Sequence, residues 1–471
     1  MIFNSLTFFF FLGVVHLVYS LPLSWRVRKT HLWLSSYIFY AAWNPPFVLL
    51  LWISTCVDWV AGQRIHRARK KEHKRLFLVL SLLVNLGLLG YFKYGNFLLE
   101  TFTVILAGIG INYQPPMSQL VLPVGISFYT FQSLSYSFDI YKGKLEPWSR
   151  FSDFAFFVTF FPQLVAGPIV RAADFLPQCT TSQRATATQM GWGLSLLVLG
   201  LFEKVILADA MLAPVADTVY GNVGSAGTMD AWVGVLAFSG QIFFDFSGYS
   251  LCAIGVAMTF GFVLPDNFRF PYAAIGFSDF WRRWHISLST WLKDYLYIPL
   301  GGNRKGGLRT HVNLMITMLL GGLWHGASWT FVAWGGLHGI YLVLERLLRQ
   351  WLGRMPFVTT APMRPVLALT TFLMVAVTYV FFRAETFGDA FALLVLMFNG
   401  VDASLLALPQ SMRVIFLVGT LFVIHYAMRN SSLEALAARL SPVWRWAVPA
   451  AALIVLCVYR GGERAFIYFQ F

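Results

Sequence analysis

The stretch Gly321-Gly322-Leu323-Trp324-His325-Gly326 places a histidine inside an apolar run that extends from Val312 to Glu345. An ionisable side chain at membrane depth is costly, so such residues usually line a cavity and mark a functional site. A second histidine, His285, precedes the run on a segment rich in aromatic residues. These two positions are the starting point for a candidate site.

The whole chain has the composition of an integral membrane protein. Of its 471 residues 58% are hydrophobic, 17% are aromatic and only 12% are charged, whereas a soluble domain has roughly 25% charged residues. Apolar runs recur along the length, and a helix needs about 20 residues to cross a bilayer. We therefore expect an all-α membrane bundle of about ten to fourteen spans, with amphipathic or re-entrant helices, in one domain over residues 1–471.

The distribution of basic residues predicts the orientation. No positive charge precedes the first apolar run, Ile2 to Leu21, and Arg26, Arg28 and Lys29 follow it, which is the reverse of a cleavable signal peptide. A second basic cluster runs from Arg64 to Arg75. The positive-inside rule places both clusters in the cytoplasm and the N-terminus outside. It also accounts for most of the +14 net charge, so no nucleic-acid partner is expected.

The segment that carries His285 has a helical pattern. Ser278 is a plausible N-cap for it. One face collects aromatic and apolar residues: Trp281, Trp284, His285, Leu288, Trp291, Leu292 and Tyr295. We expect an amphipathic helix that lies in the membrane interface or folds into the bundle.

His325 needs a partner from another element. If its apolar run were one helix, His311 and His338 would lie about 21 Å and about 19 Å from it along the axis, too far to share a proton. His285 is the best candidate. A neutral imidazole in a desolvated pocket resists protonation and remains available as a base, so we predict that His285 and His325 are catalytic.

The glycines around His325 form two pairs at four-residue spacing, Gly322 with Gly326 and Gly335 with Gly339. Small residues at this spacing let a neighbouring helix or a ligand approach the backbone closely. Helix packing alone explains the pattern equally well.

Between the two histidines lies the loop Gly301-Gly302-Asn303-Arg304-Lys305. Glycine-rich backbone with adjacent cations can wrap an anionic group, such as the phosphates of coenzyme A. We predict that Asn303, Arg304 and Lys305, together with Trp281, bind a donor. A basic cytoplasmic loop without a ligand is the alternative.

Two other sites carry charge inside apolar runs. Asp245 is interpreted as a hydrogen-bonding anchor, and Glu203-Lys204 as a paired structural couple. The cysteines match no metal-ligand spacing, so we expect no metal site.

At this point the residues resemble a known family. The run Ser278-Asp279-Phe280-Trp281-Arg282-Arg283-Trp284-His285, the stretch Tyr297–Arg304 and Leu323-Trp324-His325-Gly326 are similar to the membrane-bound O-acyltransferases, in the bacterial alginate O-acetylase branch. The terminal Phe466–Phe471 supports this similarity. One departure is Leu251-Cys252, where the family commonly has an acidic residue.

The resemblance implies helices around a thin region that a central tunnel crosses. It makes His325 the essential catalytic residue and places His285 in the tunnel lining. Trp324, Asp245 and Asp294 are expected to support the tunnel.

The resemblance also implies a reaction. Acetyl-CoA would be the donor, with no permanently bound cofactor, and a serine on an extracytoplasmic SGNH-type partner would be the first acceptor. The partner would pass acetyl to an exopolysaccharide such as alginate or cellulose. This places the protein in a polysaccharide biosynthesis complex, among lipids of the bacterial inner membrane.

Two alternatives remain open. A D-alanyl transferase serving teichoic acids is the nearest one in chemistry. A transporter or export channel is the other, with the histidines as proton-relay or gating groups. No symmetric pair of broken helices stands out in the sequence, which weakens the transporter reading.

Overall fold

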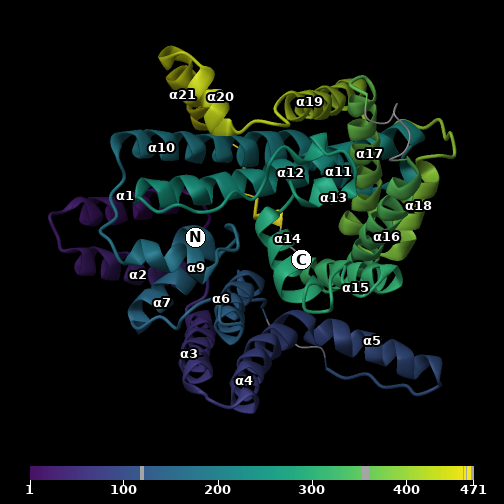
Figure 1. Ribbon diagram of the computed structural model, residues 1–471. Coiled ribbons are helices and arrows are strands. Elements are labelled where there is room, and N and C mark those ends of the chain that lie inside the picture. Colours follow the sequence, from purple (N-terminus) through teal and green to yellow (C-terminus); the bar gives the residue numbers. More distant parts are fainter. Residues whose placement is uncertain (117–120, 353–359, 460, 463, 468–471) are drawn as a thin grey trace. The chain divides into compact units, whose positions relative to one another are not determined.

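The computed structural model describes residues 1–116, 121–352, 360–459, 461–462 and 464–467, with the side chains of 350–352 left out. All regular secondary structure in these ranges is helical (Figure 1). Of the terminal motif, residues 468–471 lie outside the described part. The chain divides into two compact units, Met1–Leu194 with Ala253–Pro265, and Ser195–Cys252 with Asp266–Phe471. A single domain over residues 1–471 stays a prediction.

The first unit contains short and long helices. Their bounds are α1 (Leu6–Ser20), α2 (Trp25–Ala41), α3 (Phe47–Arg67), α4 (Lys71–Leu89), the π-helix η1 (Gly90–Tyr94), α5 (Gly95–Gly108), α6 (Ile126–Tyr141), α7 (Phe151–Thr159), α8 (Phe161–Leu164), α9 (Ala172–Phe175) and the 3-10 helix η2 (Leu176–Cys179). The boundary between the units falls within α10 (Ala187–Leu201) and α12 (Thr228–Thr259).

The second unit holds both predicted histidines. Its other elements are η3 (Phe202–Leu212, π), α11 (Ala213–Gly221), η4 (Val223–Ser225, 3-10), η5 (Pro271–Ala273, 3-10), α13 (Phe277–Trp281), α14 (Ile286–Leu292), η6 (Lys293–Tyr297, π), α15 (Gly307–His325), α16 (Trp329–Leu352), α17 (Met363–Arg383), α18 (Phe387–Leu396), α19 (Leu408–Ala427), α20 (Leu433–Arg439) and α21 (Pro442–Val458).

Six helical segments in the described ranges are long and apolar enough to cross a membrane. They are 47–67, 71–108, 228–259, 329–349, 363–383 and 408–427. This is fewer than the ten to fourteen spans expected, because several apolar runs form shorter helices. The apolar run from Leu120 to Ile140, for example, overlaps α6 (Ile126–Tyr141), a helix of only 16 residues that are nearly all buried.

The first basic cluster is partly internal. Lys29 forms an ion pair with Asp153 at 2.5 Å, and Arg28 donates to the Ser182 hydroxyl at 2.6 Å. Both cations are buried. The cluster from Arg64 to Arg75 is largely exposed, with a short connection between α3 and α4. The positive-inside rule therefore applies directly only to the exposed cluster from Arg64 to Arg75.

The apolar run around His325 is a helical hairpin and not one helix. The first helix, α15, ends at His325, and α16 begins at Trp329 and returns beside it (Figure 1). A Cβ atom on Gly322 would overlap the carbonyl oxygen of Phe331, and one on Gly335 would overlap that of Met318. The predicted close approach at these glycines is thus confirmed as packing between the two helices.

The predicted amphipathic helix is also interrupted. It forms α13, a turn and α14, and His285 stands in the turn with a left-handed backbone, φ 42°. The N-cap of α13 is Gly276, at φ 85°, and not Ser278. A glycine suits this position because positive φ is strained for other residues. A Cβ there would also lie 2.6 Å from a carboxylate oxygen of Glu345.

Candidate active site

The structure brings the two predicted histidines together. The ring centroids of His285 and His325 lie 6.2 Å apart. Both side chains are buried, with exposed fractions of 0% and 2%. A neutral imidazole carries a ring nitrogen with a free lone pair, which is what a general base needs.

Asn267, which the sequence analysis did not select, holds the turn at His285. Its backbone carbonyl accepts from the N–H of Ile286 at 2.9 Å, and its side-chain carbonyl accepts from the hydroxyl of Ser287 at 2.8 Å. These bonds stabilise the two residues that follow the left-handed His285. A left-handed non-glycine residue costs about 1–2 kcal/mol and is typical of functional positions. The sequence signal for Asn267 is the stretch Pro265-Asp266-Asn267-Phe268, which is also similar to the membrane-bound O-acyltransferases.

Aromatic rings enclose the histidine pair. Trp324 contacts both, with centroids 5.7 Å from His285 and 5.1 Å from His325. Trp334 and Phe382 lie 5.0 Å and 5.4 Å from His325. A supporting role for Trp324 stays a prediction.

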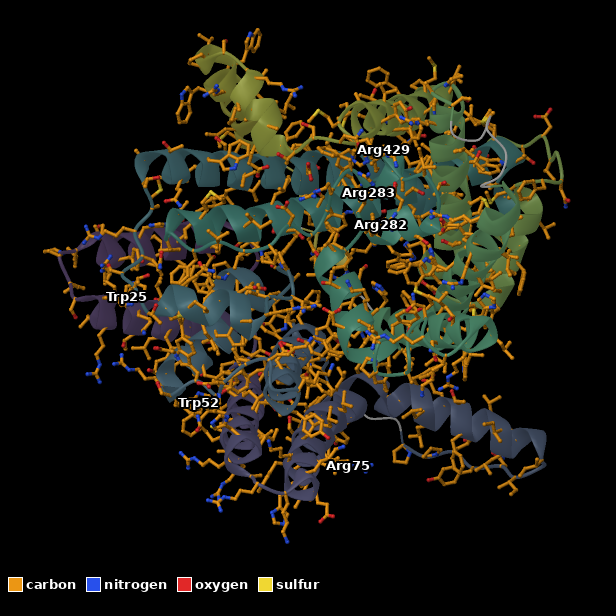
Figure 2. The ribbon with its side chains drawn as sticks, viewed as in Figure 1. Trp25, Trp52, Arg75, Arg282, Arg283 and Arg429 are labelled. Atoms are coloured by element: carbon orange, nitrogen blue, oxygen red, sulfur yellow. The ribbon has the colours of Figure 1, made fainter. Side chains whose placement is uncertain are left out.

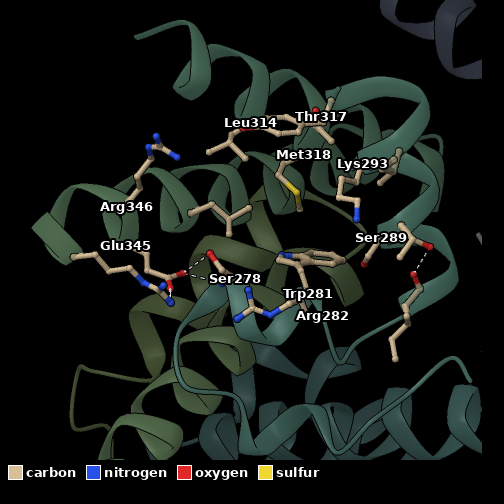
Figure 3. Close-up of a pocket in the computed structure, with 16 residues that line it drawn as sticks. Ser278, Trp281, Arg282, Ser289, Lys293, Leu314, Thr317, Met318, Glu345 and Arg346 are labelled. Carbon is tan, nitrogen blue, oxygen red and sulfur yellow. Dashed lines mark hydrogen bonds and ion pairs between the residues drawn. The ribbon is translucent and has the colours of Figure 1, made fainter. Parts of the chain in front are cut away.

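A pocket of about 670 Å³ lies beside this aromatic wall. Its lining comes from the α13–α14 region, η6, α15 and α16: Ser278, Trp281, Arg282, Ile286, Ser289, Thr290, Leu292, Lys293, Tyr297, Leu314, Thr317, Met318, Leu342, Glu345, Arg346 and Arg349. In Figure 3, Trp281 lies at the middle of the pocket, with Glu345 and Arg346 toward one end and Lys293 toward the other. The pocket is strongly basic: four cations face one carboxylate, which gives 4 − 1 = +3.

Trp281 connects the pocket to the histidines. Its ring lines the pocket and lies 5.8 Å from that of Trp334, which in turn contacts His325. The predicted loop residues Asn303, Arg304 and Lys305 are exposed and are not among the lining residues. Two of the four cations that line the pocket, Arg346 and Arg349, come from α16. Sequence reasoning missed them because only tertiary packing brings α16 to α13.

Glu345 links these two helices. Its carboxylate accepts from the backbone N–H of Ser278 at 2.7 Å and from the Ser278 hydroxyl at 3.1 Å, and it forms an ion pair with Arg349 at 2.5 Å. Arg346, by contrast, pairs with no carboxylate in the described ranges. It is therefore the cation best placed to meet an anionic ligand.

Asp279 fixes the other side of α13. Its carboxylate forms ion pairs with Arg283 at 3.0 Å and with Arg429 at 2.7 Å, and Figure 2 labels both arginines. Burial alone would raise the pKa of Asp279, but the N–H of Ile275 and the two guanidinium groups outweigh it and hold the pKa below its usual value. The pocket wall thus rests on ionised Asp279.

The interpretation of Glu203-Lys204 as a couple is wrong. Lys204 pairs with Asp245 at 2.6 Å and with Asp209 at 2.9 Å. Adjacent residues of a helix point in different directions, so residues 203 and 204 do not face each other. Asp245 also accepts from the N–H of Ile467 at 2.7 Å, so it does anchor another segment.

Asp294 has a less defined place. It is half-buried, it forms an ion pair with Lys293 at 3.9 Å, and it is not among the residues that line the pocket. Its supporting role stays a prediction.

Comparison with known proteins decides the family. The model of the membrane-bound O-acyltransferase family matches residues 147–382, which include both histidines. Over 432 residues the chain is 40% identical to the probable alginate O-acetylase AlgI of Azotobacter vinelandii, covering 90% of this chain and 83% of that protein. The chain belongs to the membrane-bound O-acyltransferase family.

Other relatives are similar to the chain over different lengths. The peptidoglycan O-acetyltransferase of Helicobacter pylori is 35% identical over 526 aligned positions, covering 100% of this chain and 98% of that protein. The teichoic acid D-alanyltransferase of Streptococcus thermophilus is 29% identical over 264 positions, 53% of this chain and 63% of that protein. The protein is therefore a membrane O-acyltransferase, and the transporter alternative is set aside.

Proposed function

We propose that the protein transfers acetyl from cytoplasmic acetyl-CoA to a hydroxyl on the other side of the membrane, for O-acetylation of a polysaccharide such as alginate, cellulose or peptidoglycan. One observation carries this proposal: the buried pair His285 and His325 stands beside a large basic pocket, with Trp281 and Trp334 between them. The O-acetyltransferase names of the relatives support the choice of acetyl.

The pocket suits the donor by charge and size. Its net charge of +3 favours the phosphates of coenzyme A, and guanidinium groups bind phosphate with directed hydrogen bonds. Its volume of about 670 Å³ falls within the range of roughly 300–1,000 Å³ that is typical of ligand pockets. We place the phosphates near Arg346 and the thioester toward His325. These contacts replace the exposed loop Asn303–Lys305 as the favoured donor site.

The histidines supply the chemistry. His325 removes the proton from the acceptor hydroxyl as its oxygen attacks the thioester carbonyl. The new C–O bond forms, the C–S bond breaks, and the coenzyme A thiolate takes the proton from His325. His285 orients the acceptor or stabilises the developing charge. A route through an acetyl-histidine stays an alternative, with the same atoms exchanged in two steps.

A route through the membrane follows from where the substrates are. Activated acetyl donors are cytoplasmic and exported polymers are outside, so a tunnel that reaches His325 from both faces would join them. We place the protein in the bacterial inner membrane with its N-terminus outside and the exposed cluster Arg64–Arg75 in the cytoplasm. A serine of an SGNH-type partner, within a polysaccharide biosynthesis complex, is the proposed first acceptor.

The test is transfer of label from acetyl-CoA to this partner by the purified protein. We expect His325→Ala to abolish transfer and His311→Ala, in the same helix, to retain it. Transfer by His325→Ala at the wild-type rate would overturn the proposal.

A further inference from the structure

We propose that the C-terminal segment Arg464–Ile467 is a positioning element of the histidine site, which acts on His285 through Phe246. The proposal rests on the function proposed above, because it assumes that the orientation of His285 matters for transfer. It assigns the segment a role that neither the family match nor the basic pocket explains.

Polar contacts hold the segment at three points in the second unit. They are an ion pair from Arg464 to Asp217 at 2.7 Å, a hydrogen bond from Lys204 to the carbonyl of Ala465 at 3.3 Å, and a hydrogen bond from the N–H of Ile467 to Asp245 at 2.7 Å. Three successive attachments fix the path of this short stretch.

The residues that hold the segment form a balanced charge network, called here the C-terminal anchor. Three carboxylates face three cations: Asp209, Asp217 and Asp245 with Lys204, Arg383 and Arg464. Lys204 and Asp245 are 5% and 2% exposed. Buried charges are tolerated only when they are paired and hydrogen-bonded. The anchor and the segment therefore depend on each other.

Aromatic contacts lead from the segment to the catalytic pair. Phe466 is 1% exposed, and its ring lies 4.6 Å from Tyr249 and 5.6 Å from Phe246. The ring of Phe246 then meets His285 edge to face at 4.6 Å and 84°. Edge-to-face pairs have a preferred geometry, so Phe246 fixes the orientation of the imidazole. Since the backbone of His285 is strained, its side chain depends on such neighbours.

Replacing Phe466 tests the proposal. We expect Phe466→Ala to lower kcat for transfer of labelled acetyl from acetyl-CoA by about tenfold, the upper range for one aromatic pair. The KM for acetyl-CoA should not change, because Phe466 does not line the donor pocket. Phe466→Leu, which fills part of the volume, should recover part of the loss.

The matched control is Phe154→Ala. Phe154 is 0% exposed, and its ring contacts Tyr136 and Phe157 in the first unit. This variant should lose stability like Phe466→Ala but keep its kcat per folded molecule.

A second variant covers the case in which Phe466→Ala fails to fold. Arg464→Gln changes a side chain that is 43% exposed, so it should fold. It should lower kcat about twofold to threefold, because an exposed ion pair contributes little energy.

Either of two results would overturn the proposal. The first is a wild-type kcat in Phe466→Ala, or in Arg464→Gln if Phe466→Ala does not fold. The second is a loss of kcat in Phe154→Ala as large as that in Phe466→Ala. Either leaves the proposed function intact as long as His325→Ala is inactive. Activity in His325→Ala would instead remove the function itself.

Discussion

Two charged regions of the second unit reach the histidine pair through aromatic side chains, and they differ in how their charges are used. The donor pocket has a net charge of +3 and a volume of about 670 Å³. The C-terminal anchor pairs three carboxylates with three cations, and all of these except Lys204 line a cavity of about 180 Å³.

The difference separates binding from support. An unbalanced pocket lowers its electrostatic energy when an anionic ligand enters, so its cations suit an external substrate. A balanced network gains nothing from a charged ligand, and here it is completed by the chain's own C-terminal segment. The same substitution should therefore have different consequences in the two regions.

The largest difference in the free energy of unfolding is expected between two lysine substitutions, one in each region. Lys204→Met leaves Asp245 and Asp209 buried without their cation and should lower the free energy of unfolding by about 3–5 kcal/mol. Lys293→Met, at a 59% exposed position in the pocket, should change it by no more than about 0.5 kcal/mol. Thermal unfolding in detergent measures both. Equal destabilisation would contradict the comparison.

A smaller effect is expected at the wall of the pocket. Asp279→Asn weakens the ion pairs to Arg283 and Arg429 and should cost about 1–3 kcal/mol. Because the folded-state pKa of Asp279 is lowered, this stability is present above the unfolded value of about 3.9 and is lost as the pH falls through the folded value. Unfolding midpoints from pH 7 to pH 3 should fall less steeply for Asp279→Asn. Parallel curves would show that ionised Asp279 does not hold α13.

The smallest effect separates the pocket from the exposed loop. Arg346→Gln should raise the KM for acetyl-CoA about tenfold with little change in kcat, since one charged hydrogen bond contributes about 1.5 kcal/mol. Arg304→Gln should change it less than about twofold if the loop is only a solvated turn. Steady-state kinetics measures both values. A larger increase in KM for Arg304→Gln than for Arg346→Gln would indicate that the loop Asn303–Lys305 binds the donor.

How far the sequence predicts this site depends on whether local or tertiary contacts decide each part. The apolar run and its glycines indicate closely packed helical structure around His325, because composition and spacing are local properties. They do not indicate that a helix ends at His325 and returns as α16. The position of His285 beside His325 involves the turn that Asn267 holds, whereas helical periodicity predicts an uninterrupted helix at His285.

The charged regions show the same limit. Asp245 stands out as a buried carboxylate, but its partners Lys204 and Ile467 are far from it in sequence. Arg346 resembles any exposed cation at the end of an apolar helix until Glu345 is seen to bind Ser278. Side-chain pairing across helices is set by packing, which periodicity alone does not specify.

The most direct test of the separation between binding and chemistry is titration of acetyl-CoA into purified His325→Ala, alongside the wild-type protein. The account predicts a Kd within about twofold of the wild-type value in a variant that transfers no acetyl, because His325 does not line the donor pocket. Loss of binding together with loss of transfer would contradict it.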